Sequence, residues 1–93
     1  MITFKTTESL ISSIRRDLSR AHPFAFERVG FVEAGLSIGP DGPILLAHTY
    51  APVEDKMYID DPRYGAMIGS DAITSAMAQA FARRVSLLHV HTH

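Results

Sequence analysis

The chain has 93 residues, of which 46% are hydrophobic, and nine basic against ten acidic side chains give it a formal charge of −1. This length predicts a single domain over residues 1–93, and this hydrophobic fraction is typical of a globular protein. The balanced charge, without a basic cluster, argues against nucleic acid as the main partner. Cysteine is absent, so disulfides and thiolate ligands are excluded, and any metal must be held by His, Asp or Glu.

No segment of the sequence has the composition of a targeting or membrane-spanning element. The first residues, Met1 to Lys5, are followed by polar residues where a signal peptide needs a long apolar stretch. The apolar runs are far shorter than the roughly 20 residues that a membrane helix requires. We therefore expect a cytoplasmic protein without a membrane partner.

The first half of the chain predicts a short strand, a helix and a hairpin. Apolar residues at helical spacing predict a helix near residues 7–21, capped by Thr6 or Thr7 and stopped by Pro23. Residues 26–38, rich in Val and Phe, predict a strand. The glycines and prolines of residues 39–43 predict a turn into a second, antiparallel strand over 44–50. One face of this second strand is expected to carry Ile44, Leu46, His48 and Tyr50.

The second half predicts a loop, a helix and a final strand. Residues 51–69 are irregular, with a short extended piece at 57–59. A second helix is expected to begin at Ser70 or Asp71, with Ile73, Met77 and Phe81 as its core stripe. The last strand begins at Val85. This order predicts an α+β, or layered α/β, domain in which helices flank a curved mixed β-sheet, and its open edge would allow a homodimer.

Three histidines at alternate positions close the sequence: His89, His91 and His93. In a strand these side chains point to one face, with next-but-one neighbours roughly 6.6 Å apart along the backbone. Two imidazoles at this spacing can converge on one metal ion, and neutral imidazole is a common zinc ligand. The pattern predicts a metal site at the end of the last strand.

Two motifs in this order resemble the JAB/MPN metalloprotease family of bacterial type. His91-Thr92-His93 resembles the His-Ser/Thr-His element of its JAMM motif, and Glu27-Arg28-Val29-Gly30 looks like its Glu-x-x-Gly signature. Residues 50–54 and 58–62 are similar to the segment that connects the two motifs. The resemblance therefore covers nearly the whole chain, and it implies an MPN/JAB-like (cytidine-deaminase-like) core.

The resemblance implies a zinc-dependent peptidase or isopeptidase. His91 and His93 would be Zn²⁺ ligands, and Glu27 would be the general base acting on the zinc-bound water. The substrate would be a protein or peptide, including ubiquitin-like conjugates. The family's remaining Ser and its third ligand, an Asp, would lie after position 93, so we expect residues 1–93 to be the N-terminal portion of the domain, with negligible turnover and weak metal affinity alone.

Other interpretations of the same residues stay open. The chain could be a non-catalytic MPN-like interaction module without metal, its sheet completed by a partner or a second copy. It could also be a small metal-binding protein that uses His89, His91 and His93 together. Glu33 is a second carboxylate near Glu27, but it lacks the Glu-x-x-Gly spacing and is expected at the surface.

Overall fold

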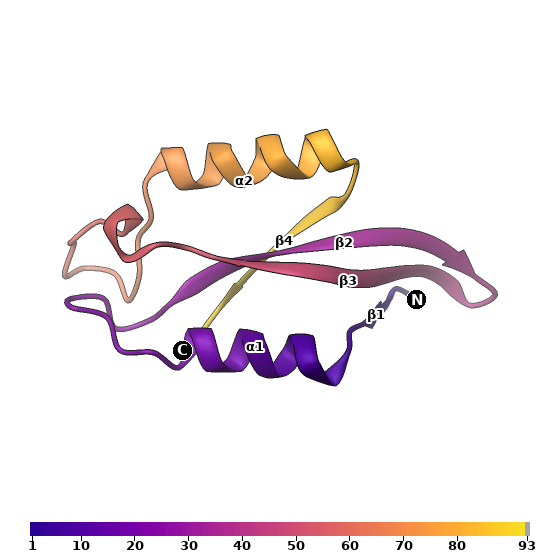
Figure 1. The fold of residues 1–93 in the computed structure, drawn as a ribbon, viewed down its shortest axis with the longest axis horizontal. Coiled ribbons are helices and arrows are strands. Elements are labelled where there is room, and N and C mark those ends of the chain that lie inside the picture. Colours follow the sequence, from indigo (N-terminus) through magenta and orange to yellow (C-terminus); the bar gives the residue numbers. More distant parts are fainter. Residues whose placement is uncertain (93) are drawn as a thin grey trace.

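Four strands form one mixed sheet between two helices in the computed structural model, which describes residues 1–92 (Figure 1). The elements follow in the order β1 (Thr3–Lys5), α1 (Glu8–Leu18), β2 (Val29–Gly39), β3 (Gly42–Pro52), the 3₁₀ turn η1 (Asp55–Met57), α2 (Ser70–Arg83) and β4 (Ser86–His91). The expected order of strand, helix, hairpin, loop, helix and strand is confirmed, and the fold is α+β.

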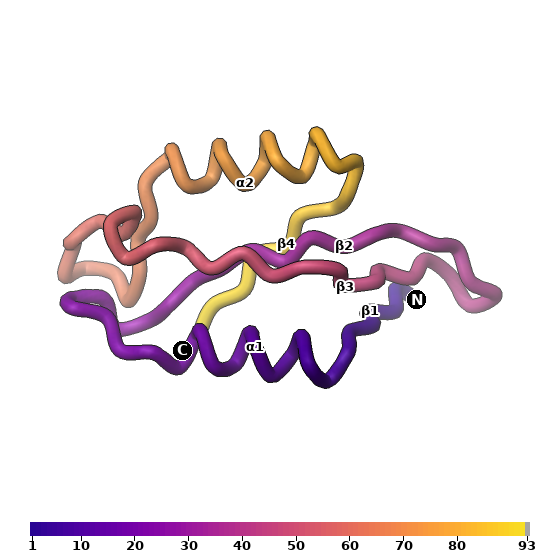
Figure 2. Tube along the Cα trace, viewed as in Figure 1, coloured from indigo at the N-terminus to yellow at the C-terminus, as the bar shows by residue number. Residues whose placement is uncertain are grey.

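The sheet has the strand order β1-β3-β2-β4. β1 is parallel to β3, whereas β2 is antiparallel to both of its neighbours, β3 and β4. Helix α1 covers one face of the sheet and α2 covers the other (Figure 1). Figure 2 shows that the chain leaves α2 and crosses the sheet obliquely through β4. Two hydrogen bonds between Thr92 and Arg28 place the last described residue beside the segment that joins α1 to β2.

The main core lies between α2 and the sheet. Its buried members come from β2, from the segment around η1 and from α2: Val29, Phe31, Val53, Tyr58 and Ala72. On the opposite face, Ile14 of α1 is buried over the sheet, and Val32 of β2 has only 1% of its surface exposed. The first six residues of β2, 29–34, are therefore buried on both faces, as expected of a central strand.

Helix α2 packs on the sheet through a different stripe from the one expected. Ala72 and Ala80 are buried, and Ala76 packs against the main core. Ile73, Met77 and Phe81 are 41%, 59% and 87% exposed, so their prediction as core was wrong. Both stripes have the spacing i, i+4, i+8, and the small alanine side chains let the helix backbone approach the sheet closely.

The ends of the elements follow local chemistry. The Thr7 hydroxyl accepts a hydrogen bond from the Leu10 amide at 3.1 Å and caps α1, as expected. The cap of α2 is Gly69, not Ser70 or Asp71, and it makes no side-chain hydrogen bond. The expected extended piece at 57–59 is found at Tyr58, which has an extended backbone and makes an isolated bridge to Ile68, whereas Met57 belongs to η1 (Asp55–Met57).

A β-bulge changes which side chains share a face of β3. Glu33 of β2 pairs with Thr49, but the next residue, Ala34, pairs with Ala47, so His48 is the extra residue. The His48 ring lies over Gly35, where an added Cβ would be 2.5 Å from Nε2. Because an inserted residue reverses the alternation, Tyr50 lies on the α1 face, away from Ile44 and Leu46. The expectation of one common face was wrong for Tyr50.

The packing of α2 predicts opposite effects for two neighbouring residues. Ala80→Leu should lower the free energy of unfolding by about 1–3 kcal/mol, because the larger side chain cannot fit between helix and sheet. Phe81→Ser, at an 87% exposed position, should change it by less than about 0.5 kcal/mol. Urea unfolding followed by circular dichroism measures both values, and a larger loss for Phe81→Ser would contradict this orientation of α2.

Candidate metal centre

The register between β2 and β4 brings the two sequence motifs to one end of the sheet. Val29 pairs with His91, and Phe31 pairs with His89. Beyond the strands, the Thr92 amide donates to the Arg28 carbonyl at 3.1 Å, and the Arg28 amide donates to the Thr92 hydroxyl at 3.0 Å. The residue after Glu27 is therefore fixed directly to the residue after His91.

Glu27 lies in a bend just before β2, which begins at Val29 and not at Phe26 as expected. The amides of Phe26 and Glu27 both donate to the Gly65 carbonyl, at 2.8 and 2.9 Å. The half-buried Glu27 side chain lies against Gly65, where an added Cβ would be 2.6 Å from the Glu27 carboxyl carbon. Gly65 therefore leaves the space that this carboxylate occupies.

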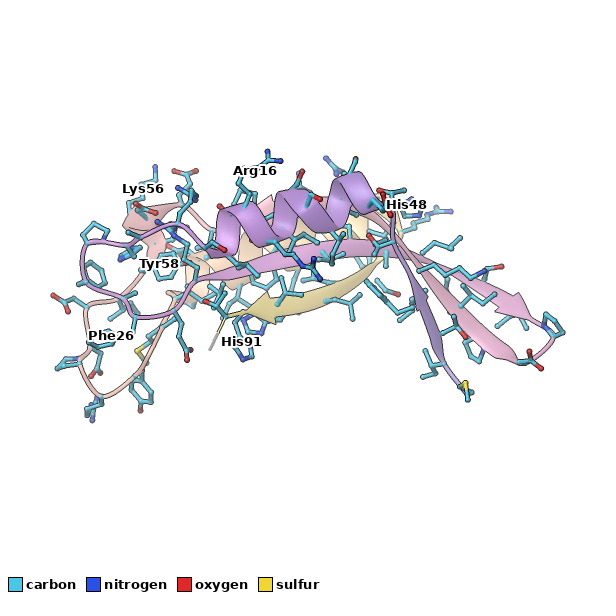
Figure 3. The ribbon with its side chains drawn as sticks, turned by 90° about the horizontal axis from the view of Figure 1, so that it is seen from below. Arg16, Phe26, His48, Lys56, Tyr58 and His91 are labelled. Atoms are coloured by element: carbon cyan, nitrogen blue, oxygen red, sulfur yellow. The ribbon has the colours of Figure 1, made fainter. Side chains whose placement is uncertain are left out.

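His89 and His91 lie on the same face of β4, as their spacing predicted. Their rings stack with centroids 5.3 Å apart, and the His89 ring also contacts Phe31 at 5.9 Å. The pKa of His89 is lowered, mainly by partial burial and to a smaller extent by the neighbouring His91. The lowered pKa favours the neutral imidazole, which is the form that binds metals. Figure 3 shows the His91 side chain projecting from β4 at the margin of the sheet. The third predicted residue, His93, lies outside the described residues.

The described residues provide only part of a zinc ligand set. Within residues 1–92, no group of three or more His, Asp or Glu side chains is arranged to hold a metal ion. His91 has the ligand chemistry that zinc prefers and sits on a regular strand, and Glu27 approaches the same end of the sheet. The described residues thus bring the backbone segments of Glu27 and His91 to one end of the sheet, and they form no complete metal ligand set.

The buried guanidinium of Arg28 fixes the loop that carries Glu27. Arg28 is 2% exposed, and it donates to the carbonyls of Arg20 at 2.8 Å and Ala21 at 2.7 Å. It also pairs with the Asp55 carboxylate at 2.8 Å, which raises the pKa of Arg28 and lowers that of Asp55. This role of Arg28 was not predicted from the sequence. The signal that could have indicated it is a charged residue directly before an apolar strand.

Gly30, the last residue of the Glu-x-x-Gly signature, lies beneath the ring of Tyr50. A Cβ at this position would be 2.1 Å from the Tyr50 hydroxyl oxygen. That hydroxyl donates to the Asp17 carboxylate of α1, and burial together with this bond raises the pKa of Tyr50. Gly30 is therefore required for close packing between the sheet and the C-terminal end of α1.

Glu33 is buried, with 5% of its surface exposed, which corrects its expected place at the surface. Its carboxylate accepts hydrogen bonds from Arg83 of α2 at 2.8 Å and from the Thr49 hydroxyl at 2.9 Å. The ion pair therefore ties α2 to the sheet. These partners give Glu33 a structural role.

A cavity of about 270 Å³ lies beside the core, between α2 and the end of β3. Phe31, whose ring contacts His89, forms part of its wall, and Met57 and Ala76 give it an apolar lining. Polar groups of Glu54, Ser75 and Gln79 also line it. Its volume and lining suit one apolar side chain with a polar end.

Comparisons with protein-family models, with curated proteins and with solved structures found no match for this chain. Among residues 1–92, no helix has both the length and the apolar composition needed to cross a membrane.

Gly30→Ala should lower the free energy of unfolding by about 1–3 kcal/mol, because the new methyl group displaces the Tyr50 ring and breaks its bond to Asp17. The matched test is a double-mutant cycle with Tyr50→Ala, measured by urea unfolding. In the Tyr50→Ala background the same glycine substitution should cost much less. Equal costs in both backgrounds would show that the ring does not restrict this position.

Acid should remove the contribution of the Arg28–Asp55 pair. The folded-state pKa of Asp55 is lowered, so its stabilising effect is complete above the unfolded pKa of about 3.9 and is lost as the pH falls through the folded-state value. Asp55→Asn should therefore be less stable than the natural protein at pH 6, and the difference should shrink below about pH 4. Thermal unfolding of both proteins across this pH range measures the stability difference. A difference that grows as the pH falls would contradict the prediction.

Proposed function

We propose that this domain belongs to a zinc-dependent metallopeptidase of the JAMM type, which hydrolyses an amide or isopeptide bond of a protein substrate. The supporting observation is the register of β2 and β4, in which Val29 pairs with His91 and Arg28 is joined to Thr92 through two hydrogen bonds. It brings the end of the chain that carries the histidine motif beside the loop that carries Glu27. In this proposal His91 and His93 are zinc ligands.

Glu27 acts as the general base. Its carboxylate takes a proton from the attacking water, and the resulting carboxyl group then gives a proton to the departing amine. Bound zinc supplies the Lewis acidity that promotes the attack on the amide carbonyl. The two amides that donate to the Gly65 carbonyl hold the Glu27 backbone in place, which limits the movement of its carboxylate during proton transfer.

The substrate is a polypeptide with an extended segment near β4. The cavity on the other side of Phe31 can take one apolar side chain of that segment, with Ser75 and Gln79 near its polar end. A ubiquitin-like conjugate, in which the acyl group comes from a flexible C-terminus and the amine from a lysine, satisfies this requirement.

The first test is the coding sequence downstream of His93, where the proposal requires a Ser followed closely by an Asp. In a protein that carries them, Glu27→Gln should keep stoichiometric zinc and lose at least about 100-fold in hydrolysis of an isopeptide-linked substrate. His91→Ala should lose both zinc and hydrolysis. Metal analysis and a fluorogenic isopeptide assay provide the two readouts.

Glu33→Gln is the matched control, because Glu33 is a buried carboxylate of β2 that contacts Arg83. It should lower stability but keep the rate constant of the folded enzyme. Undiminished hydrolysis by Glu27→Gln would refute the assigned base, and full zinc content in His91→Ala would refute the ligand set.

A non-catalytic interaction module is the second candidate, and the exposed apolar residues of the distal hairpin favour it. Leu36 and Ile38 are 63% and 75% exposed, and both lie where β2 and β3 extend beyond the two helices (Figure 1). Exposed apolar patches of this kind are typical of protein-binding surfaces. This candidate requires no zinc, so the metal content of the purified protein separates it from the peptidase.

A further inference from the structure

In the sheet that residues 1–92 form, β4 is an edge strand. It is the outermost strand in the order β1-β3-β2-β4, and Figure 3 shows it along the margin of the molecule. The opposite edge, β1, has only three residues and carries Lys5, two features that hinder edge-to-edge pairing. β4 has six residues, Ser-Leu-Leu-His-Val-His, without lysine or proline. A further strand can therefore pair more easily with β4 than with β1.

The outer edge of β4 presents the backbone of the two histidines. The Thr92 amide points toward β2, because it donates to the Arg28 carbonyl. Hydrogen-bonding directions alternate along an antiparallel strand, so the amide and carbonyl of Val90 also point toward β2, and those of His89 and His91 point away from it. An antiparallel strand added at this edge would bond to His89 and His91.

The same two residues carry half of a metal site. Their imidazoles share one face, with ring centroids 5.3 Å apart, and both side chains are exposed. No third His, Asp or Glu completes a group with them among residues 1–92. Zinc in proteins takes four ligands, three of them from the protein even where a water completes the set. Further donors must complete the ligand set, and a second copy of the chain can provide two more imidazoles.

We propose that two copies of this chain pair antiparallel through β4 and bind one zinc ion with His89 and His91 of each copy. The two-fold axis passes through Val90, so His89 lies opposite His91 of the partner subunit. Residues opposite each other in a hydrogen-bonded pair have Cα atoms about 5.5 Å apart and side chains on the same face. Four imidazoles then lie together on one face of a continuous eight-stranded sheet, and their nitrogens can surround the ion tetrahedrally.

This zinc site is distinct from the proposed hydrolytic centre. It uses His89, which that centre leaves out, and it uses neither Glu27 nor His93. Both sites require His91, so a chain in the zinc-bridged dimer cannot form the hydrolytic centre at the same time. Variants at His89 and at Glu27 therefore separate the two proposals.

The test is the mass of the 93-residue chain, measured by light scattering after size exclusion, in EDTA and then with zinc chloride. The chain should be monomeric in EDTA and dimeric with zinc, with one zinc ion per two chains. His89→Ala should weaken zinc-dependent dimerisation at least about 100-fold, because it removes two of four ligands from each site. The matched control His48→Ala removes an exposed histidine of β3 and should dimerise normally.

Glu27→Gln and His93→Ala should also dimerise normally. One zinc ion per monomer, a dimer of equal strength in EDTA, or undiminished dimerisation of His89→Ala would each overturn the proposal. Circular dichroism in EDTA confirms that the exposed-site variant His89→Ala is folded.

A cysteine placed on the axis tests the register, since the chain has no cysteine of its own. Cα atoms in a non-hydrogen-bonded antiparallel pair are about 4.5 Å apart, a separation that a disulfide can bridge. Val90→Cys should therefore form a disulfide-linked dimer with diamide in zinc but not in EDTA. Ser86→Cys, at the far end of the same strand, should not. A zinc-dependent dimer in which only Ser86→Cys cross-links would overturn the register.

Discussion

The buried guanidinium of Arg28 is the interaction on which the arrangement of the candidate site depends. Its side chain bonds to two carbonyls after α1 and to the Asp55 carboxylate at the start of η1, while its backbone bonds to Thr92, just after β4. One residue thus contacts three other segments of the chain. A buried cation without partners would be costly, so the segment after α1 and the start of η1 must both be in place around the guanidinium. Glu27 is held because it precedes this residue.

The α2 face of the sheet adds a second buried charge, Glu33, paired with Arg83. Removing Arg83 would leave the buried Glu33 carboxylate without its cationic partner, so the pair constrains where α2 can dock. The helix itself contributes mainly alanines to that contact, and small side chains specify a position less sharply than large ones. The ion pair therefore adds to a contact that the helix makes mainly with small apolar side chains, and it fixes the position of α2 over β2 and β4.

The fold could be predicted from the sequence wherever a local rule decided the outcome. The Thr7 cap, the hairpin turn and the final strand follow from side-chain hydrogen bonding, turn residues and apolar patterning. The errors arose where two patterns have equal periodicity. Alanine and large apolar residues in α2 repeat with the same spacing, and only the tertiary contacts decide which stripe is buried. The bulge at His48 is likewise invisible in the pattern, although it reverses the face of Tyr50.

The candidate site could be predicted only in part, for a similar reason. The alternate histidines predicted a shared face, and their stacked rings agree with it. The approach of the Glu27 segment to the end of β4 depends on strand register, which no local pattern encodes. Its prediction from the sequence was therefore based on the family resemblance alone. The roles of Arg28 and Gly65 were missed, because a side chain that holds a loop and a glycine that leaves space for a carboxylate have no spacing signature.

The bonds between Arg28 and Thr92 join residues 64 positions apart in a chain of 93 residues. Contacts of such long range close a large loop and form slowly compared with helices and hairpins. During synthesis on the ribosome, β1, α1 and the β2–β3 hairpin can assemble before β4 has been translated. Until then one side of β2 remains unpaired and apolar, so a newly made chain passes through a stage at which chaperones or other strands can compete for the place of β4.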